Sequence, residues 1–403
     1  MMSNVYPQWD IPTIIFYVIL AYIGVYCIKK GQYVSYPHFH RVNSKVVVNS
    51  YYVLWWLIWT LAATFRLINA NGVGGTDAWT YINYFQIANN TSFSNTDDII
   101  LKYALHYEPL WKYYTEFIRL FTDNYKVFLF ITYGFIVYSY QKFIKGFEFE
   151  KVYAAPFICL FFVYLRGFNT LRTNVAAAFI LLMTLALKDE KYKKAIILGI
   201  CSVGMQVSSA LYCLFIPFYW FYKKGVLNKY KVFLLLIVSI VIGKVTQKLL
   251  TGNLGLLMGH SYASYASHNI GKSFMDNFWK VAFTQILIGI MLFLFDKKIK
   301  KRIAVGNNIS KSLLFLRTVC IFDVVTIPIT FVLDIWRGYE YFYVARLMMW
   351  SVITDIVLRK QLSGTRKLII ALEFVIFTAW LIFRIYSTYK GSGYVPYVIS
   401  IFD

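Results

Sequence analysis

Long apolar runs separated by short polar gaps extend over the whole chain, and this alternation predicts a bundle of membrane-spanning helices. A helical crossing needs about 20 predominantly apolar residues. The first such run covers residues 11–28 and the last covers residues 368–386. Further runs lie at residues 46–68, 125–143, 152–165, 170–187, 233–250, 278–295, 313–333 and 339–358. We therefore predict an all-α polytopic integral membrane protein, with residues 1–403 forming a single transmembrane domain.

One apolar stretch, residues 195–222, is too long for a single crossing and short for two, and lysines flank both of its ends. We interpret it as two short or broken helices that meet at residues 206–209, which brings the predicted total to about 12 crossings. Irregular backbone at membrane depth persists only where protein groups or water satisfy its hydrogen bonds. The break is therefore expected to line a cavity.

Two longer polar stretches, at about residues 69–124 and 251–277, predict external loops. In the first loop, apolar side chains recur at helical spacing from Pro109 to about Phe121. These side chains are Leu110, Trp111, Tyr114, Phe117, Ile118 and Phe121. Residues three or four positions apart share one face of a helix, so this segment is predicted to be an amphipathic helix at the outer membrane interface.

The basic residues indicate the orientation in the membrane. The chain carries 41 lysines and arginines against 19 acidic residues, a formal net charge of +22. They cluster in short gaps between apolar runs, as the positive-inside rule describes for cytoplasmic loops. The clearest of these gaps are residues 29–30, 142–151, 188–194, 223–231, 297–301 and 359–367. The charge therefore predicts that both termini are outside, and no nucleic-acid partner is expected.

Composition agrees with the membrane class and excludes an ordinary soluble domain. The mean hydropathy is +0.55, and 59% of the residues are hydrophobic. The cysteines lie inside apolar runs without metal-site or disulfide spacing, so we expect them to be packing residues. They are Cys27, Cys159, Cys201, Cys213 and Cys320. No signal-peptide pattern precedes Ile11, so we expect the first run to be retained as a membrane anchor.

Two carboxylates of the first loop have both a plain and a catalytic interpretation. Glu108 precedes Pro109, and proline is favoured at the first position of a helix. Its carboxylate could simply stabilise the positive end of that helix by roughly 0.3 to 1 kcal/mol, or it could act in catalysis with the nearby His106. Asp77 follows the glycine-rich turn of residues 74–76, where Thr or Asp could simply cap the next helix. Both interpretations stay open for each residue.

Arginines gather near the predicted outer ends of several crossings: Arg66, Arg166, Arg172, Arg337, Arg346 and Arg384. Arginine offers a planar fork that matches phosphate oxygens, and ionisable residues at membrane depth are functional candidates by default. The plainer alternatives are snorkelling, for Arg66, and pairing of others with Asp334 or Glu340. We expect some of these arginines to bind an anionic headgroup. Charged residues in the inner halves of crossings are expected to form internal ion pairs: Arg317, Asp323, Asp355 and Glu373.

The order of several motifs resembles the EpsG family of Wzy-like bacterial polysaccharide polymerases. In chain order these are Arg66, Gly75-Thr76-Asp77 with Tyr81 and Phe85, His106-Tyr107-Glu108-Pro109, and Asn169-Thr170-Leu171-Arg172 followed by Ala176 to Ala178. The segment from Met205 to Ala210 is similar to one in which the family more often has a histidine, and here Gln206 takes its place. The tail from Gly393 to Tyr397 resembles the family's C-terminal proline-tyrosine.

The resemblance implies a glycosyltransferase of the bacterial inner or plasma membrane that needs no cofactor or metal. Its substrate would be an oligosaccharide repeat unit linked to polyisoprenyl pyrophosphate. The growing glycan would pass from one such carrier to the non-reducing end of another lipid-linked unit on the outer face. Membrane lipid, a chain-length regulator and a flippase are the further partners that this function implies.

This function also implies roles for the residues singled out above. A base must deprotonate the acceptor hydroxyl, and the candidates are Glu108, Asp77 and His106. Arginines would stabilise the departing pyrophosphate electrostatically. The first candidates are Arg172 and Arg166, then Arg66, Arg337 and Arg346. His260 and Tyr262 of the second external loop are further candidates for substrate binding.

Other functions are compatible with the same pattern. A metal-dependent lipid-phosphate-sugar glycosyltransferase could use Asp97-Asp98, although this pair also suits a solvated helix cap. A lipid-linked oligosaccharide flippase or another transporter would also need basic cavity residues, but the arginines favour the outer ends over the full depth of a pore. An acyltransferase using His106 or His260 has the least support.

Overall fold

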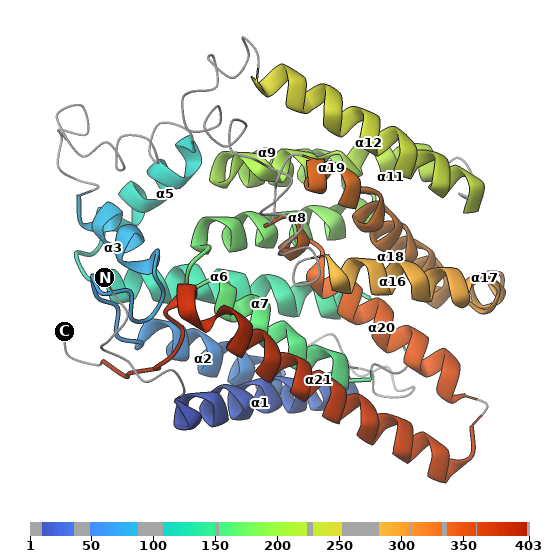
Figure 1. Cartoon of the computed structure of the whole chain (residues 1–403), viewed down its shortest axis with the longest axis horizontal. Helices are drawn as coiled ribbons and strands as arrows, with labels where there is room; N and C mark the ends of the chain where they lie inside the picture. Colours follow the sequence, from blue (N-terminus) through green and yellow to red (C-terminus); the bar gives the residue numbers. More distant parts are fainter. Residues whose placement is uncertain are drawn as a thin grey trace, which may run out of the picture.

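Helices of very different length run side by side through the molecule in the computed structural model (Figure 1). The structure describes residues 10–35, 49–87, 108–147, 149, 153–223, 229–251, 282–306, 308–332, 337–359 and 361–400. Within these residues the regular elements are helical, apart from a β-bridge between Arg66 and Ile399. Among these described residues, five stretches are long and apolar enough to cross a membrane: Ile11–Gly31, Tyr125–Lys145, Leu171–Lys188, Ile309–Val332 and Ser363–Thr388. The predicted all-α membrane architecture is confirmed, while the total of twelve crossings stays a prediction.

The long helices are α1 (Ile11–Ser35), α6 (Tyr125–Lys145), α8 (Leu171–Lys188), α12 (Lys229–Thr251), α18 (Asn308–Val325) and α21 (Ser363–Ser392). Shorter helices complete the bundle: α2 (Ser50–Thr64), α3 (Ala78–Ile87), α5 (Pro109–Arg119), α16 (Phe283–Leu294), α17 (Asp296–Ile303), α19 (Ile327–Val332) and α20 (Tyr343–Leu358). The predicted loop helix is confirmed as α5. Its Trp111 and Ile118 pack inward, whereas Phe117 and Phe121 are 60% and 74% exposed. Exposed aromatic side chains beside a buried face suit a helix that lies at an interface.

Helix α8 lies in the interior, where small side chains allow close packing. Ala176 to Ala178 are buried, and the Ser202 hydroxyl of α9 (Tyr192–Met205) donates to the Ala176 carbonyl oxygen at 2.9 Å. Beside α8, the predicted crossing at residues 152–165 is a short, wholly buried pair, η1 (Ala155–Cys159) and α7 (Leu160–Arg166). At about 1.5 Å per residue this pair is much shorter than a 30 Å hydrocarbon core. It ends at Arg166, which it carries to the end of the bundle where the polar clusters lie.

The predicted break at residues 206–209 is confirmed. Helix α9 ends at Met205, and Gln206 is extended, with φ −156° and ψ 114°. The chain then continues through η2 (Val207–Ser209), α10 (Ala210–Cys213) and α11 (Phe215–Lys223). The Ser208 hydroxyl lies 3.1 Å from the hydroxyl of Tyr341, so protein groups satisfy part of the irregular segment.

The C-terminal tail folds back over the same end of the bundle. Helix α21 stops at Gly393, whose φ of +64° suits glycine. The tail then pairs with the segment after α2: the Leu67 amide donates to Val398 O at 2.7 Å, and the Ser400 amide to Phe65 O at 2.8 Å. The hydroxyl of Tyr397 donates to the carbonyl oxygen of Ala62 at 2.8 Å. The proline-tyrosine tail therefore joins the first and last parts of the described chain.

The two ends of the bundle differ in charge. Helix α6 ends with Lys142 and Lys145, α8 ends with Lys188, and α17 carries a run of lysines. These positions lie at the end opposite to α3, α5 and the tail (Figure 1). The separation agrees with the predicted gathering of basic gaps on one face.

Candidate functional site

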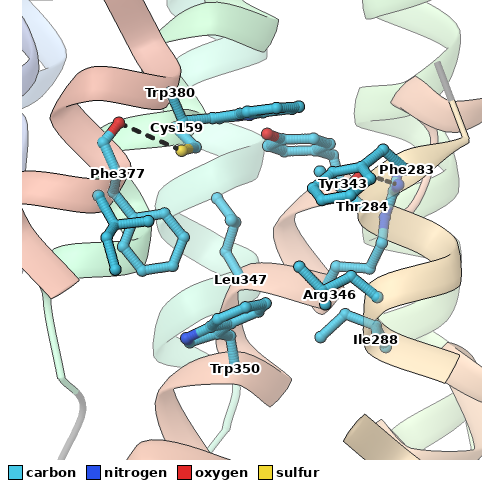
Figure 2. A pocket seen from close by; sticks show the side chains of 12 residues that line it. Cys159, Phe283, Thr284, Ile288, Tyr343, Arg346, Leu347, Trp350, Phe377 and Trp380 are labelled. Carbon is cyan, nitrogen blue, oxygen red and sulfur yellow. Dashed lines mark hydrogen bonds between the residues drawn. The ribbon is translucent and has the colours of Figure 1, made fainter. Parts of the chain in front are cut away.

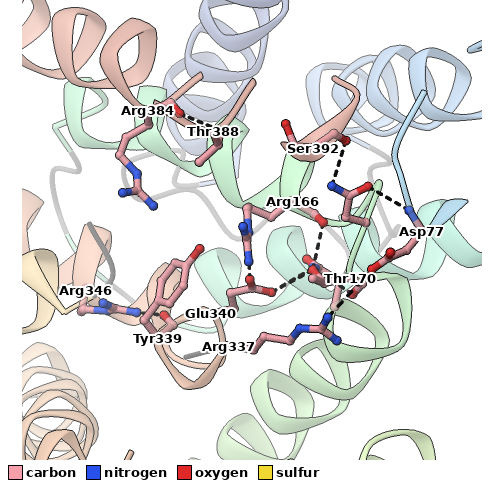
Figure 3. A network of polar contacts seen from close by, with 12 residues as sticks. Asp77, Arg166, Thr170, Arg337, Tyr339, Glu340, Arg346, Arg384, Thr388 and Ser392 are labelled. Carbon is pink, nitrogen blue, oxygen red and sulfur yellow. Dashed lines mark hydrogen bonds and ion pairs between the residues drawn. The ribbon is translucent and has the colours of Figure 1, made fainter. Parts of the chain in front are cut away.

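A glycine-rich turn, residues 74–77, packs directly onto the segment between α7 and α8. Gly74 and Gly75 have φ angles of +79° and +124°, a range that favours glycine. A Cβ atom on Gly75 would lie 2.5 Å from the carbonyl oxygen of Phe168. The Asp77 amide donates to the Asn169 side chain at 3.4 Å, and Asn169 Nδ2 donates to Ser392 O at 2.8 Å (Figure 3). One asparagine thus links the turn, the start of α8 and the tail.

Arg66 supports the glycine-rich turn through hydrogen bonds and is only 1% exposed. Its Nε donates to the carbonyl oxygen of Gly74 at 2.8 Å, and its Nη1 donates to that of Ala63. The guanidinium carbon lies 4.0 Å from the ring centroid of Phe168. The protein itself therefore occupies the arginine fork, and the snorkelling alternative does not apply to this buried side chain.

Glu108 and Arg172 form a buried ion pair. Glu108 begins α5, but its side chain makes no capping hydrogen bond. Its Oε2 instead accepts a hydrogen bond from Nη1 of Arg172 on α8, with side-chain exposures of 3% and 19%. The backbone amide of Val207, in the broken helix, lies close enough to the Glu108 carboxylate to lower its pKa. The plain capping role is therefore not the one observed, and the pair explains how a cation is tolerated in the first turn of α8.

Burial raises the pKa of Glu108 above its usual value of 4.5. Arg172 and Arg337 both lower this pKa, but desolvation outweighs them. A carboxyl group with a raised pKa is a stronger base once it is ionised, which suits proton transfer near neutral pH.

Asp77, the second candidate base, lies at the rim of the same site. Its side chain is 52% exposed, and Oδ2 is 3.9 Å from Nη2 of Arg337. Tyr81, one turn along α3, donates from its hydroxyl to the Asn169 carbonyl oxygen at 3.3 Å. The ring centroid of Tyr81 is 5.9 Å from the guanidinium carbon of Arg172. Asp77, Arg337, Arg172 and Glu108 are therefore one connected group of charges.

A second buried network surrounds Glu340, on η3 (Gly338–Glu340), whose side chain is fully buried. Its Oε1 accepts a hydrogen bond from Arg166 Nε at 3.1 Å, and its Oε2 accepts from Thr170 Oγ1 at 3.1 Å and Asn174 Nδ2 at 3.2 Å (Figure 3). Arg166 therefore has an acidic partner, as one of the sequence alternatives allowed. Of the Asn169-Thr170 motif before Arg172, Thr170 takes part in this network, whereas Asn169 binds the turn and Ser392.

Arg346 also has an acidic partner in the interior. Its Nε lies 3.1 Å from Oδ2 of Asp323, whose Oδ1 accepts a hydrogen bond from Gln285 Nε2 at 2.8 Å. The internal pairs expected for Arg317, Asp323 and Asp355 are confirmed, through Asp296, Arg346 and Arg302. The same expectation is wrong for Glu373, which accepts hydrogen bonds from Trp350 and Thr354. Uncharged donors suffice because that carboxyl group lies on a half-buried face.

Some of the sequence candidates lie outside the described residues. These are His106, His260, Tyr262 and the Asp97-Asp98 pair. Among the residues that are described, no three His, Cys, Asp or Glu side chains come together as a metal ion would require.

Sequence reasoning named Glu340 only as a possible partner of an arginine, not as the centre of a network, and it missed the backbone of Val207 beside Glu108. Glu340 carried a signal, since it is an acidic residue in an apolar context close to Arg337 and Arg346. The role of Val207 depends on the backbone of a broken helix, which no side chain in the sequence reports.

Comparison with known proteins adds one finding. The EpsG family model matches residues 49–399. No curated protein and no solved structure matches the chain. The matched range contains the turn, the Glu108–Arg172 pair, the Glu340 network and the tail residues that contact them.

Proposed function

The chain belongs to the EpsG family, and from this premise we propose that it polymerises lipid-linked glycan repeat units at the end of the bundle where the motifs meet. Membership points to a membrane protein of the polysaccharide polymerase type. The proposal adds the substrate and the step: a glycan leaves polyisoprenyl pyrophosphate and joins the non-reducing end of a second lipid-linked unit.

One observation carries the proposal. Motif segments from distant parts of the chain converge around the Glu108–Arg172 pair: the turn at residues 74–77, the start of α8, the break after α9, and η3. A buried acid beside several cations is costly to maintain, and such groups are characteristic of sites where charge develops during a reaction.

We assign the base to Glu108. In the proposed step its carboxylate takes the proton of the acceptor hydroxyl, whose oxygen forms a bond to the anomeric carbon of the donor glycan. The bond from that carbon to the pyrophosphate breaks, and polyisoprenyl pyrophosphate leaves with the electron pair. Asp77 at the more exposed rim is better placed to position the incoming sugar, because its charge lies next to Arg337.

The arginines divide into two groups under this assignment. Arg172 and Arg337 lie beside the acid and supply positive charge where the leaving group becomes more anionic. Arg66 and Arg166 hold the turn and the Glu340 network, so we assign them positioning roles. The external aromatic surface of α5 offers platforms for sugar rings and for the interface.

The orientation completes the proposal. In this proposal the lysine-rich end of the bundle faces the cytoplasm, and the site and the described tail would then lie outside a bacterial inner or plasma membrane. Repeat units would reach this face after flipping, and a chain-length regulator would act on the product.

The decisive test is a product ladder from purified protein in liposomes supplied with lipid-linked repeat units. Glu108→Gln should lower polymerisation by at least about 100-fold, the usual scale for loss of a general base. Glu116→Gln is the matched control, since Glu116 lies on the same helix in a partly exposed pair with Lys112 and should leave the ladder unchanged.

A Glu108→Asp variant separates chemistry from folding. It keeps the negative charge beside Arg172 but withdraws the carboxylate by one methylene, so the protein should remain folded and still be slow. A normal ladder from folded Glu108→Gln protein would refute the assignment. Loss of activity on adding a chelator would instead favour the metal-dependent alternative, and transport without lengthening of the glycan would favour a flippase.

A further inference from the structure

Arg384 differs from the other buried arginines of this end of the molecule. It lies on α21 and is 3% exposed, with its guanidinium carbon 4.6 Å from the ring centroid of Phe162 and 5.8 Å from that of Trp380. Its electrostatic neighbours are Tyr339, Tyr343 and Arg166, and no carboxylate of the described chain is among them. A buried cation without an acidic partner is expensive, so this position calls for an anion from elsewhere.

Unused hydrogen-bond donors surround this cation. Nη1 of Arg384 and the hydroxyls of Tyr339 and Tyr394 are buried and form no hydrogen bond of ordinary geometry within the part of the chain that the structure describes, although the Tyr339 hydroxyl lies close enough to the guanidinium of Arg384 to interact with it. Tyr339 neighbours both Arg384 and Tyr394. In Figure 3 no dashed line reaches the guanidinium of Arg384 or the hydroxyl of Tyr339. Buried polar groups nearly always have partners, so orphan donors that share neighbours indicate a missing acceptor.

The chemistry of these donors selects the kind of acceptor. Burial raises the pKa of both Tyr339 and Tyr394, so each hydroxyl stays protonated and can donate. A guanidinium flanked by hydroxyl donors matches the oxygens of a phosphate group.

An apolar cleft, whose lining Figure 2 shows, includes Trp380, the aromatic neighbour of Arg384. It lies between α16, α20 and α21, has a cavity volume of about 90 Å³ and is partly open to the surroundings. Its walls include Phe283, Leu287, Leu347, Trp350, Ile376, Phe377 and Trp380. Cys159 and Tyr343, which also line the cleft, are electrostatic neighbours of Arg384. Trp380 lies one helical turn before Arg384, so this cation lies beside the part of the cleft that Trp380 lines.

We propose that this cleft holds the polyisoprenyl chain of the lipid-linked acceptor unit, with its phosphate bound by Arg384, Tyr339 and Tyr394. The identity of the lipid rests on the proposed function, whereas the site rests on the geometry. An apolar channel that ends in a buried cation has the polarity of an isoprenoid followed by a phosphate. Arg166 lies 5.9 Å from the Tyr339 ring and binds Glu340, so a sugar attached to that phosphate would extend toward the proposed catalytic group.

Binding of a long-chain polyisoprenyl pyrophosphate to the purified full-length protein in phosphatidylcholine nanodiscs tests this assignment, with native mass spectrometry as the readout. Arg384→Gln should weaken binding by at least about tenfold, because it removes the charge that meets a buried phosphate. Tyr339→Phe should weaken it by about threefold or more through loss of one hydrogen bond. Without lipid, Arg384→Gln should unfold at the same or a higher temperature than the parent, since it removes an unpaired buried charge.

The cleft is tested with two neighbouring positions on α21. Ile376 lines the cleft and is 60% exposed, whereas Val375 is 65% exposed and does not line it. Ile376→Trp should fill the channel and weaken binding by at least about tenfold, while Val375→Trp should bind like the parent. Because both side chains are exposed, both variants should fold.

Competitors identify the ligand. Inorganic pyrophosphate and the uncharged polyisoprenol should each compete weakly, and phosphatidylglycerol should not displace the probe. Equal competition by phosphatidylglycerol would show an ordinary annular lipid site and overturn the proposal. Unchanged binding of the probe by Arg384→Gln, or an equal loss of probe binding in Ile376→Trp and Val375→Trp, would also overturn the proposal. If the probe binds as expected but no polymer forms, the proposed function fails while the lipid site stands. If the protein polymerises and these variants bind the probe like the parent, the lipid site fails while the proposed function stands.

Discussion

At the scale of single residues, the arginines of this chain are distinguished by what they contact. Arg172, Arg166 and Arg346 have carboxylate partners, and carbonyl oxygens occupy the fork of Arg66. Arg384 has no such partner among the described residues. The guanidinium group is the same in each case, so the neighbouring acceptors decide whether it builds the protein or is available to a ligand.

The pH dependence of polymerisation follows from Glu108. Its pKa is raised by burial, so its carboxylate forms only above the ordinary value of 4.5. The polymerisation rate should therefore rise with pH through a transition that lies above that value. Glu108→Gln should remove this rise of the polymerisation rate with pH. The measurement is the initial rate of ladder formation as a function of pH, with Glu116→Gln as the control that keeps this rise.

The contribution of Glu108 to the free energy of unfolding should fall with rising pH, whereas the polymerisation rate should rise. A group whose pKa is raised on folding contributes stability below its unfolded pKa, and this contribution is lost as pH rises through the folded value. Glu108 should therefore favour the folded protein most in acid. A polymerisation rate that falls as pH rises through the folded-state pKa of Glu108 would contradict the role of Glu108 as the base.

At the scale of elements, the described tail and the glycine turn work as one unit. The Gly74 amide donates to Gly393 O at 3.0 Å, and the Thr76 amide donates to Ser392 O at 3.2 Å. Through Asn169 the same unit fixes the start of α8, which carries Arg172. The end of α21 is therefore part of the support of the site, although it is far from Arg172 in the sequence.

Replacing Gly393 tests this support. Gly393 has φ +64°, and a Cβ atom there would lie 1.8 Å from the carbonyl oxygen of Gly72. Gly393→Ala should lower the free energy of unfolding by about 1 to 3 kcal/mol and reduce polymerisation, because the turn that holds Asp77 would shift. Unfolding in detergent and the product ladder measure the two effects.

The matched control is Gly364→Ala, at the other end of the same helix. A Cβ atom on Gly364 meets nothing within 4 Å, so this variant should be neutral or slightly stabilising, by up to about 1 kcal/mol. Equal behaviour of the two variants would show that tail docking is not required.

At the scale of the whole molecule, charge and function are separated along the bundle. The lysine-rich ends of α6, α8 and α17 lie opposite the end that carries α3, α5 and the tail (Figure 1). Lysines remain on the cytoplasmic side during insertion, which would present the opposite end to flipped substrates.

Cysteine labelling in intact cells tests this orientation. Asp123 lies between α5 and α6 with its side chain 85% exposed, and Lys298 lies on α17. Asp123→Cys should react with a membrane-impermeant thiol reagent, whereas Lys298→Cys should react only after the membrane is opened. The parent protein, whose own cysteines lie inside apolar helices, provides the blank. The reversed labelling pattern would contradict the proposed topology.

The sequence by itself determined the all-α membrane class, the helix that follows Pro109, the break near Gln206 and the order of motifs that indicated the family. These features follow from local hydrophobic periodicity, turn chemistry and composition, which each short segment carries alone. Only the tertiary structure decided which arginine meets which acid, because Arg166 and Glu340, or Arg172 and Glu108, are distant in sequence and pair through packing. It also decided that Arg384 stands beside an apolar cleft without an acidic partner in the described chain, since an unfilled position becomes visible only when all its neighbours are in place.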